Sequence, residues 1–152
     1  MFEIIQAIRV EWCHCDPARI IYNPHYFFWM DIATGRLLEE AGFDVIRMIE
    51  ADSSFRGVPL LNNRSTFHYP ARAGDVLRLH TKVSRFGRTS FDVDHRFFLG
   101  PQPVAEGTEV RVWTRSHPED PKRLKSAPLP DEVRAALSNP ATRDLSPVPA
   151  GR

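Results

Sequence analysis

The stretch from Pro24 to Ala41 constrains the fold more than any other part of the sequence. Apolar side chains recur there at helical spacing, which predicts one long helix. The main stripe comprises Phe27, Met30, Thr34, Leu37, Leu38 and Ala41, and it is widened by Phe28, Trp29 and Ile32. Asn23 is a suitable N-cap and Pro24 a suitable first helical residue. Because the apolar surface is so wide, we expect a sheet to enclose this helix.

Strand patterns flank the predicted helix on both sides. One strand is expected over 2–12, although its alternation is imperfect, and a short second helix over 44–51. From Gly57 onward, alternating residues predict four strands, at 58–69, 76–86, 89–99 and 104–115, and a terminal helix is expected over 130–137. This order predicts the α+β class, with an antiparallel five-stranded sheet wrapped around one long central helix.

The length of 152 residues predicts one domain, which we place at 1–138. Residues 139–152 are rich in Pro, Ala and Ser and lack an apolar face, so they are expected to be a disordered tail. A net charge of +1 favours neither nucleic acid nor membrane as a partner. No apolar run approaches the ~20 residues that span a bilayer. The N-terminus lacks signal-peptide features, and Cys13 and Cys15 are too close for an unstrained disulfide, so a reduced, cytoplasmic protein is expected.

An acidic residue, Asp16, precedes the predicted helix by a few positions. Pro17 disfavours the α region for Asp16, so its carboxylate is expected on extended or turn backbone. Free backbone N–H groups at a helix start can polarise a carbonyl. An acid beside such a helix start suggests acyl-transfer chemistry, although an Asp before Pro is also common in ordinary turns.

Three motifs carry a resemblance to a known family: the Asp16-Pro17-Ala18 segment, the run from Tyr22 to Tyr26, and the acid at Asp31. Over roughly residues 10–113 the sequence resembles the hot-dog-fold acyl-CoA thioesterases, most of all the 4-hydroxybenzoyl-CoA thioesterase type. The resemblance implies hydrolysis of an acyl-CoA to a free acid and coenzyme A, without a metal or an organic cofactor. It also implies an active site at a dimer interface, and hence a homodimer or homotetramer.

By the same resemblance, Asp16 is the catalytic carboxylate, acting either as nucleophile or as general base. A backbone N–H of Tyr22 or Asn23 would bind the thioester oxygen, since Pro24 has none. The family usually has glycine where this chain has Arg19. The turn after Asp16, or access to the pocket, is therefore expected to differ.

Substrate recognition is predicted to involve His25, Trp29 and Asp31. Asp31 matches an acid that recognises a ring hydroxyl in the family, which favours 4-hydroxybenzoyl as the acyl group. It also lies among apolar helix residues, so its carboxylate is expected to be poorly hydrated unless a donor such as a phenol bonds to it. A solvent-facing charge is the alternative for Asp31.

Basic residues concentrate late in the sequence, with five between 111 and 125 against the two acids Glu119 and Asp120. A planar guanidinium suits phosphate, so this region could bind coenzyme A. The candidates are Arg88, Arg115, Lys122 and Arg123. A solvated rim of charge is the alternative.

Two other functions stay open. One is a thioesterase for aliphatic acyl-CoA or acyl-carrier protein, and the other is a hot-dog protein that binds acyl-CoA without turning it over, which Arg19 makes worth keeping. A metal site built from Cys13, His14, Cys15 and His25 is not favoured, because no second closely spaced ligand pair lies elsewhere.

Overall fold

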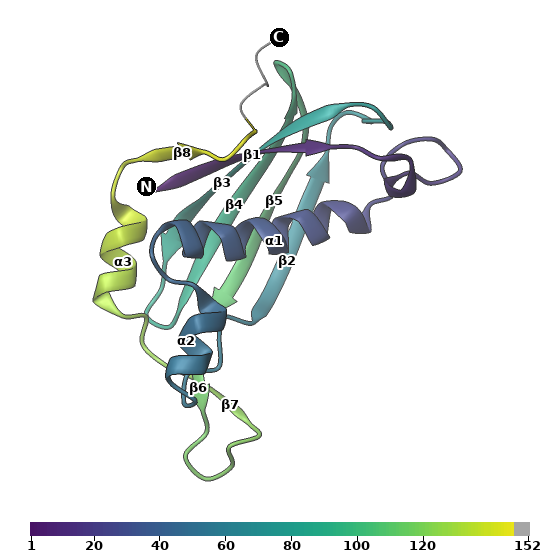
Figure 1. The fold of residues 1–152 in the computed structure, drawn as a ribbon. Coiled ribbons are helices and arrows are strands. Elements are labelled where there is room, and N and C mark those ends of the chain that lie inside the picture. The colour runs from purple at the N-terminus through teal and green to yellow at the C-terminus, as the bar shows by residue number, and fades with distance from the viewer. Residues whose placement is uncertain (148–152) are drawn as a thin grey trace.

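One long helix, α1 (Pro24–Glu40), crosses a curved sheet in the computed structural model, which describes residues 1–147 (Figure 1). The six strands of this sheet run in the order β2-β5-β4-β3-β1-β8. Their bounds are β1 (Glu3–Arg9), β2 (Leu60–Phe67), β3 (Val76–Phe86), β4 (Ser90–Leu99), β5 (Gln102–Val112) and β8 (Thr142–Asp144). The other elements are η1 (Trp12–His14), α2 (Val45–Ala51), β6 (Thr114–Ser116), β7 (Leu124–Ser126) and α3 (Asp131–Ser138).

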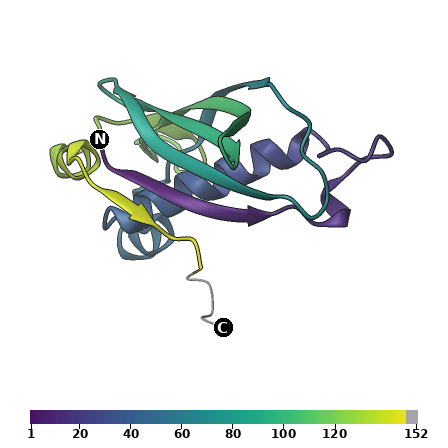
Figure 2. The ribbon, with the colours of Figure 1, turned by 90° about the horizontal axis from the view of Figure 1, so that it is seen from above.

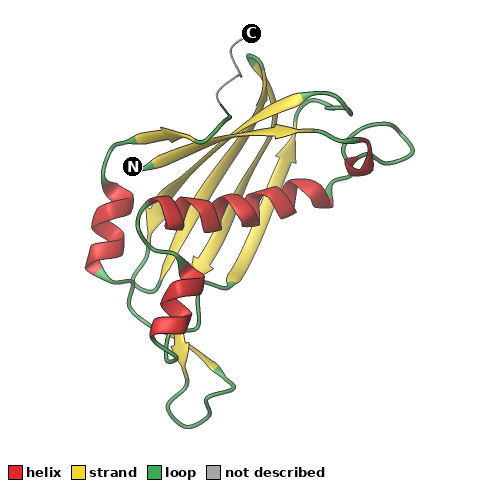
Figure 3. Ribbon diagram, viewed as in Figure 1, coloured by secondary structure: helices red, strands yellow, loops and turns green. Residues whose placement is uncertain are grey.

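The predicted α+β hot-dog architecture is confirmed, with a single long helix packed on a mostly antiparallel sheet (Figure 3). The first strand is shorter than predicted, because it ends at Arg9 and Trp12–His14 form a 3₁₀ turn. Nδ1 of His14 accepts a hydrogen bond of 2.9 Å from the Glu11 N–H. This local bond belongs to the 3₁₀ turn, whereas the strand itself ends where Arg9 pairs with Val76, the first residue of its partner β3.

The predicted disordered tail is wrong for residues 142–144, which form β8 parallel to β1 (Figure 2). The N–H of Glu3 donates to the Ala141 carbonyl at 2.8 Å, and the N–H of Leu145 donates to the Ile5 carbonyl at 2.7 Å. These bonds use the open edge of β1 and need no apolar pattern in the added strand, so hydrophobic periodicity could not reveal it. Residues 139–141 and 145–147 of the predicted tail flank β8, and residues 148–152 lie outside the described residues.

The sheet covers only one face of α1. Seven residues of the helix are buried against the sheet: Tyr26, Trp29, Met30, Ala33, Thr34, Leu37 and Leu38. On the opposite face, Phe28 is 63% exposed and Ile32 is 44% exposed, so the curved sheet leaves these two side chains uncovered within one chain. Two large apolar side chains therefore remain available for contact with another surface.

The start of α1 also differs from the prediction. Asn23 has helical dihedral angles, and its side chain makes no capping hydrogen bond. Pro24 does stand at the first turn, as predicted. No helix within the described part of the chain is long and apolar enough to cross a membrane.

Candidate active site

The loop that carries Asp16 is joined tightly to the start of α1. Cys15 and Ile21 form an antiparallel bridge across its base, and the Asp16 N–H donates to the Ile20 carbonyl at 3.0 Å. Oδ1 of Asp16 accepts a hydrogen bond of 2.8 Å from the Ala18 N–H. The carboxylate therefore lies on a turn just ahead of the helix, as predicted, with one oxygen bound within the turn.

Arg19 closes this turn with a φ of 62°, and its N–H donates to the Asp16 carbonyl at 2.8 Å. This is the left-handed region, which glycine occupies without strain and other residues occupy at a cost. The arginine thus adopts a backbone conformation that a glycine would also adopt. The difference from the family's glycine therefore lies in the arginine side chain, which borders the pocket beside Asp16, and not in the backbone.

An open pocket of about 870 Å³ adjoins Asp16. One wall is the segment from Trp12 to Arg19, which includes both free cysteines. The other wall is the loop between β2 and β3, which contributes Arg72 and Ala73. The two walls are linked, because the Ile21 N–H donates to the Ala71 carbonyl at 3.0 Å. Asp16 therefore faces a cavity large enough for part of a small organic substrate.

The backbone N–H groups at the start of α1 are not equally available. The Tyr22 N–H donates to the His14 carbonyl at 2.9 Å, and the N–H groups of His25 and Tyr26 donate to the Tyr22 and Asn23 carbonyls at 3.0 and 3.1 Å. Pro24 has no N–H. Among residues 22–26, the Asn23 N–H alone has no hydrogen-bond acceptor in the described structure. Of the two predicted oxyanion donors, Tyr22 is thus already engaged within the chain.

His25 and Trp29 form an aromatic cluster with His14 beside the helix start. The ring centroids of His14 and His25 are 5.0 Å apart, and those of His14 and Trp29 are 5.2 Å apart. Trp29 is buried and His25 half-buried, and neither lines the pocket that contains Asp16. Within residues 1–147, no group of three His, Cys, Asp or Glu side chains is arranged to hold a metal ion.

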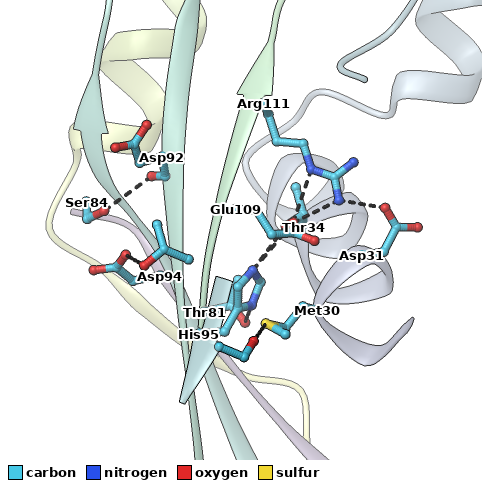
Figure 4. Close-up of polar contacts among 12 residues, drawn as sticks. Met30, Asp31, Thr34, Thr81, Ser84, Asp92, Asp94, His95, Glu109 and Arg111 are labelled. Atoms are coloured by element: carbon cyan, nitrogen blue, oxygen red, sulfur yellow. Dashed lines mark hydrogen bonds and ion pairs between the residues drawn. The ribbon is translucent and has the colours of Figure 1, made fainter. Parts of the chain in front are cut away.

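Asp31 is placed differently from the prediction. Its side chain is 64% exposed, and Oδ1 accepts a hydrogen bond of 2.6 Å from Nη2 of Arg111 (Figure 4). The prediction that this carboxylate is poorly hydrated and needs a substrate donor is therefore wrong. Asp31 is exposed to solvent, and Arg111, which reaches the helix from β5, already donates a hydrogen bond to it. Asp31 does not line the pocket beside Asp16.

Arg111 also belongs to a buried polar network that was not predicted from the sequence (Figure 4). Its Nη2 and Nε donate to Oε2 of Glu109 at 2.8 and 3.1 Å, and Oγ1 of Thr34 donates to the same oxygen at 2.6 Å. Nε2 of His95 lies 3.5 Å from this oxygen, and Nδ1 of His95 lies 3.1 Å from Oγ1 of Thr81. Glu109 and His95 are fully buried.

The charge of Glu109 is set by opposing effects. Burial raises the pKa of its carboxyl, but the hydrogen bonds from His95 and Thr34 and the charge of Arg111 lower it more, so the net shift is downward. A usable signal was present in the sequence, because His95 alternates with the apolar Phe91, Val93 and Phe97 along one strand. A histidine on an inward-facing position needs polar partners.

The basic residues proposed for coenzyme A lie far from Asp16 in one chain. Arg115 is on β6, where its Nη1 lies 2.9 Å from Oδ2 of Asp52, just after α2. That region follows the C-terminal end of α1, whereas the Asp16 loop precedes its N-terminal end (Figure 1). Lys122 and Arg123 are exposed in the connection between β6 and β7, and Arg88 is exposed beside β4. One protomer does not bring these four side chains together with Asp16.

A long helix on a curved antiparallel sheet, with a carboxylate on a turn ahead of the helix start, defines a hot-dog-fold thioester hydrolase. Comparison with known proteins gives the family. The chain belongs to the thioesterase-like superfamily, whose family profile matches residues 10–137.

Three relatives show the range of the family near this chain. A 4-hydroxybenzoyl-CoA thioesterase of Pseudomonas sp. strain CBS-3 is 29% identical over 127 residues, covering 80% of this chain and 88% of that protein. A 1,4-dihydroxy-2-naphthoyl-CoA hydrolase of Synechococcus sp. strain WH7803 is 28% identical over 140 residues, covering 85% and 84%. The solved structure of a gentisyl-coenzyme A thioesterase superposes with a TM-score of 0.76 at 28% identity, covering 88% of this chain and 99% of that one.

Proposed function

We propose that this chain hydrolyses an aromatic acyl-CoA, such as 4-hydroxybenzoyl-CoA, to the free acid and coenzyme A. The observation that carries the proposal is Asp16, which borders an open pocket and lies on a turn joined to the start of α1. The names of the three relatives support the substrate class, since each acts on a hydroxylated aromatic acyl-CoA.

In the proposed reaction, the thioester oxygen binds at the N-terminus of α1 and accepts a hydrogen bond from the Asn23 N–H. The positive end of the helix stabilises the negative charge that develops on this oxygen. Asp16 then acts in one of two ways. It attacks the carbonyl carbon, expelling the thiolate and forming a mixed anhydride that water hydrolyses, or it takes a proton from a water that attacks instead. Both routes yield one acid and one thiol, and neither needs a metal or an organic cofactor.

Asp31 remains a candidate for recognition of a ring hydroxyl, in a modified form. Arg111 bonds to Oδ1 of Asp31, while Oδ2 has no partner among the described residues. This second oxygen can accept a hydrogen bond from a phenol. Because Arg111 already balances the charge of Asp31, we expect the contact to add selectivity without being essential for binding.

We also propose that the working enzyme is a homo-oligomer. β2 is the outer strand of the sheet and has no neighbour on its other side within the described residues. Its Leu61 is 71% exposed, and Phe28 and Ile32 lie exposed on the open face of α1. A second copy that covers these surfaces could bring the basic residues of one protomer toward Asp16 of the other.

Both cysteines are free thiols, which fits a reducing cytoplasm.

The experiment that tests the proposed function is thiol release from a panel of thioesters. The panel contains 4-hydroxybenzoyl-CoA, benzoyl-CoA, a medium-chain aliphatic acyl-CoA and an acyl-carrier-protein thioester. We expect 4-hydroxybenzoyl-CoA to have the highest kcat/KM, and Asp31→Ala to reduce its advantage over benzoyl-CoA. Faster turnover of the aliphatic substrates would contradict the aromatic assignment, and binding without thiol release would contradict catalysis altogether.

A further inference from the structure

The pocket beside Asp16 contains two arginines that the predicted chemistry does not use. Arg19 belongs to the turn that carries Asp16, and Arg72 belongs to the opposite wall. Among the described residues, Asp16 is the only acid that lines this pocket, so these residues contribute two positive charges and one negative charge to its walls. Neither arginine side chain makes an ion pair or a hydrogen bond within residues 1–147. Two arginines whose side chains have no partner among the described residues therefore line the same cavity as the candidate catalytic carboxylate.

The backbone at Arg19 adds a second observation. Its φ of 62° places the backbone of a residue with a long side chain in the left-handed region. That conformation is less favourable than the right-handed region for any residue with a Cβ atom. Strained residues of this kind cluster at ligand-binding sites, where the surrounding structure fixes them. Here the turn is fixed by the bond between the Arg19 N–H and the Asp16 carbonyl.

The backbone of Arg72, on the opposite wall of the pocket, is fixed by hydrogen bonds of its own loop. Its backbone N–H donates to Oδ2 of Asp75 at 2.8 Å, and the neighbouring Gly74 N–H donates to the Val10 carbonyl at 2.8 Å. The bond from Ile21 to Ala71 ties this loop to the Asp16 loop. The two backbone positions are thus fixed relative to each other, and the ordering cost of binding falls mainly on the side chains.

The chemistry of the pocket selects the kind of ligand. A guanidinium presents a planar pair of donors that matches carboxylate and phosphate groups. Trp12, Pro17 and Ala73 give the same pocket apolar walls. The occupant should therefore combine an anionic group with an apolar portion. A CoA thioester does so in two ways, through the phosphates of coenzyme A or through a carboxylate on the acyl group.

We infer that Arg19 and Arg72 form an anion-binding subsite of the Asp16 pocket, which binds a phosphate or carboxylate of the thioester substrate. This inference rests on the proposed thioesterase function and adds a specificity determinant to it. It differs from the coenzyme A patch expected late in the sequence, whose residues lie beyond the other end of α1.

Direct binding measurements test the subsite without requiring turnover. The ligands are benzoyl-CoA, 4-carboxybenzoyl-CoA and the two corresponding pantetheine thioesters, which lack phosphates. Calorimetry is carried out on Asp16→Asn protein with Arg19→Gly, Arg72→Ala or both added. Arg19→Gly is a clean substitution because glycine accepts the left-handed backbone, and Arg19→Lys retains the charge. The matched control is Arg47→Ala, an exposed arginine on α2 that does not line the pocket.

Removing both arginines should weaken binding of the anionic ligand by at least about tenfold, as expected when charge-assisted hydrogen bonds are lost. If the anion is a phosphate, both CoA thioesters lose affinity and both pantetheine thioesters do not. If it is a carboxylate, the loss follows the 4-carboxybenzoyl group in either series. Arg19→Lys should retain most of the affinity, and Arg47→Ala all of it.

Three results would overturn the subsite: unchanged affinity for every ligand, an equal loss for the uncharged benzoyl pantetheine thioester, or no binding by any anionic ligand. Hydrolysis of the same four thioesters by the unmodified enzyme separates this outcome from failure of the proposed function. Turnover with unchanged binding in the variants contradicts the subsite alone. Binding that depends on the arginines without turnover contradicts the thioesterase function alone.

Discussion

The guanidinium of Arg111 lies 2.6 Å from the carboxylate of Asp31, and this ion pair connects an exposed acid on α1 to the buried interior of the sheet. Behind Arg111, Glu109 has no exposed surface and shares one oxygen among Arg111, Thr34 and His95. The position of Asp31 on the open helix face is therefore linked to residues of β3, β4 and β5. A substitution of a buried residue in this network should therefore alter the position of Asp31 at the proposed recognition site.

Glu109→Gln should destabilise the fold by about 3–5 kcal/mol, because it leaves the buried Arg111 without its main counter-charge. Asp31→Asn removes the exposed end of the same network and should cost no more than about 1 kcal/mol. Urea unfolding of the two variants measures the difference. Equal losses of unfolding free energy would show that the buried carboxylate has no special role.

The contact of α1 with the sheet should be most sensitive at Gly107. A Cβ atom placed there would lie 2.5 Å from Sδ of Met30 and 2.8 Å from Oγ of Ser65. Gly107→Ala should therefore cost about 1–3 kcal/mol through overpacking. Gly35→Ala is the matched control, because a Cβ there meets no atom within 4 Å. It should stabilise the helix by about 0.5–1 kcal/mol, and thermal unfolding that ranks the two variants the other way would contradict this packing.

Tyr26 gives the fold a dependence on alkaline pH. Burial, followed by the negative charges of Asp75 and Cys15, raises its pKa from 10.0 to about 12. The neutral phenol is thus favoured in the folded state, so its contribution to stability is complete below pH 10 and is lost as the pH rises toward 12. Urea unfolding across this range should show the decline, and Tyr26→Phe should reduce it. The exposed Tyr22 provides the control, and an unchanged slope in Tyr26→Phe would contradict the assignment.

The sequence was sufficient for most of the fold because the apolar periods of α1 and the four later strands are long and regular. The strand β8 was not predicted because it pairs through backbone groups on an open edge and buries no apolar face. The Arg111–Asp31 ion pair was not predicted because the two residues are 80 positions apart, and no local pattern reveals which helix residue a strand arginine reaches. Asp16 was predicted as the catalytic carboxylate because its turn precedes the helix start in sequence and because the Asp16-Pro17-Ala18 segment resembles the family motif.

The exposed apolar surfaces of α1 and β2 should hold a second copy of the chain. Phe28→Glu or Leu61→Glu should shift the protein toward monomer, because each places a charge in the proposed contact. Light scattering coupled to size-exclusion chromatography measures the shift, with Ile46→Glu on α2 as a control at an equally exposed apolar position. A monomeric parent protein, or variants that assemble as the parent does, would contradict the proposed interface.

The most direct test of the account is the turnover of Asp16→Asn. The asparagine side-chain oxygen can still accept the hydrogen bond from the Ala18 N–H, so the turn and the fold should be retained. The nucleophile or general base is lost, and kcat for 4-hydroxybenzoyl-CoA should fall at least ~100-fold. Thiol release is measured together with thermal unfolding, to show that the variant is folded. We expect a folded, nearly inactive protein, and a folded protein with near-parental kcat would contradict the catalytic role of Asp16.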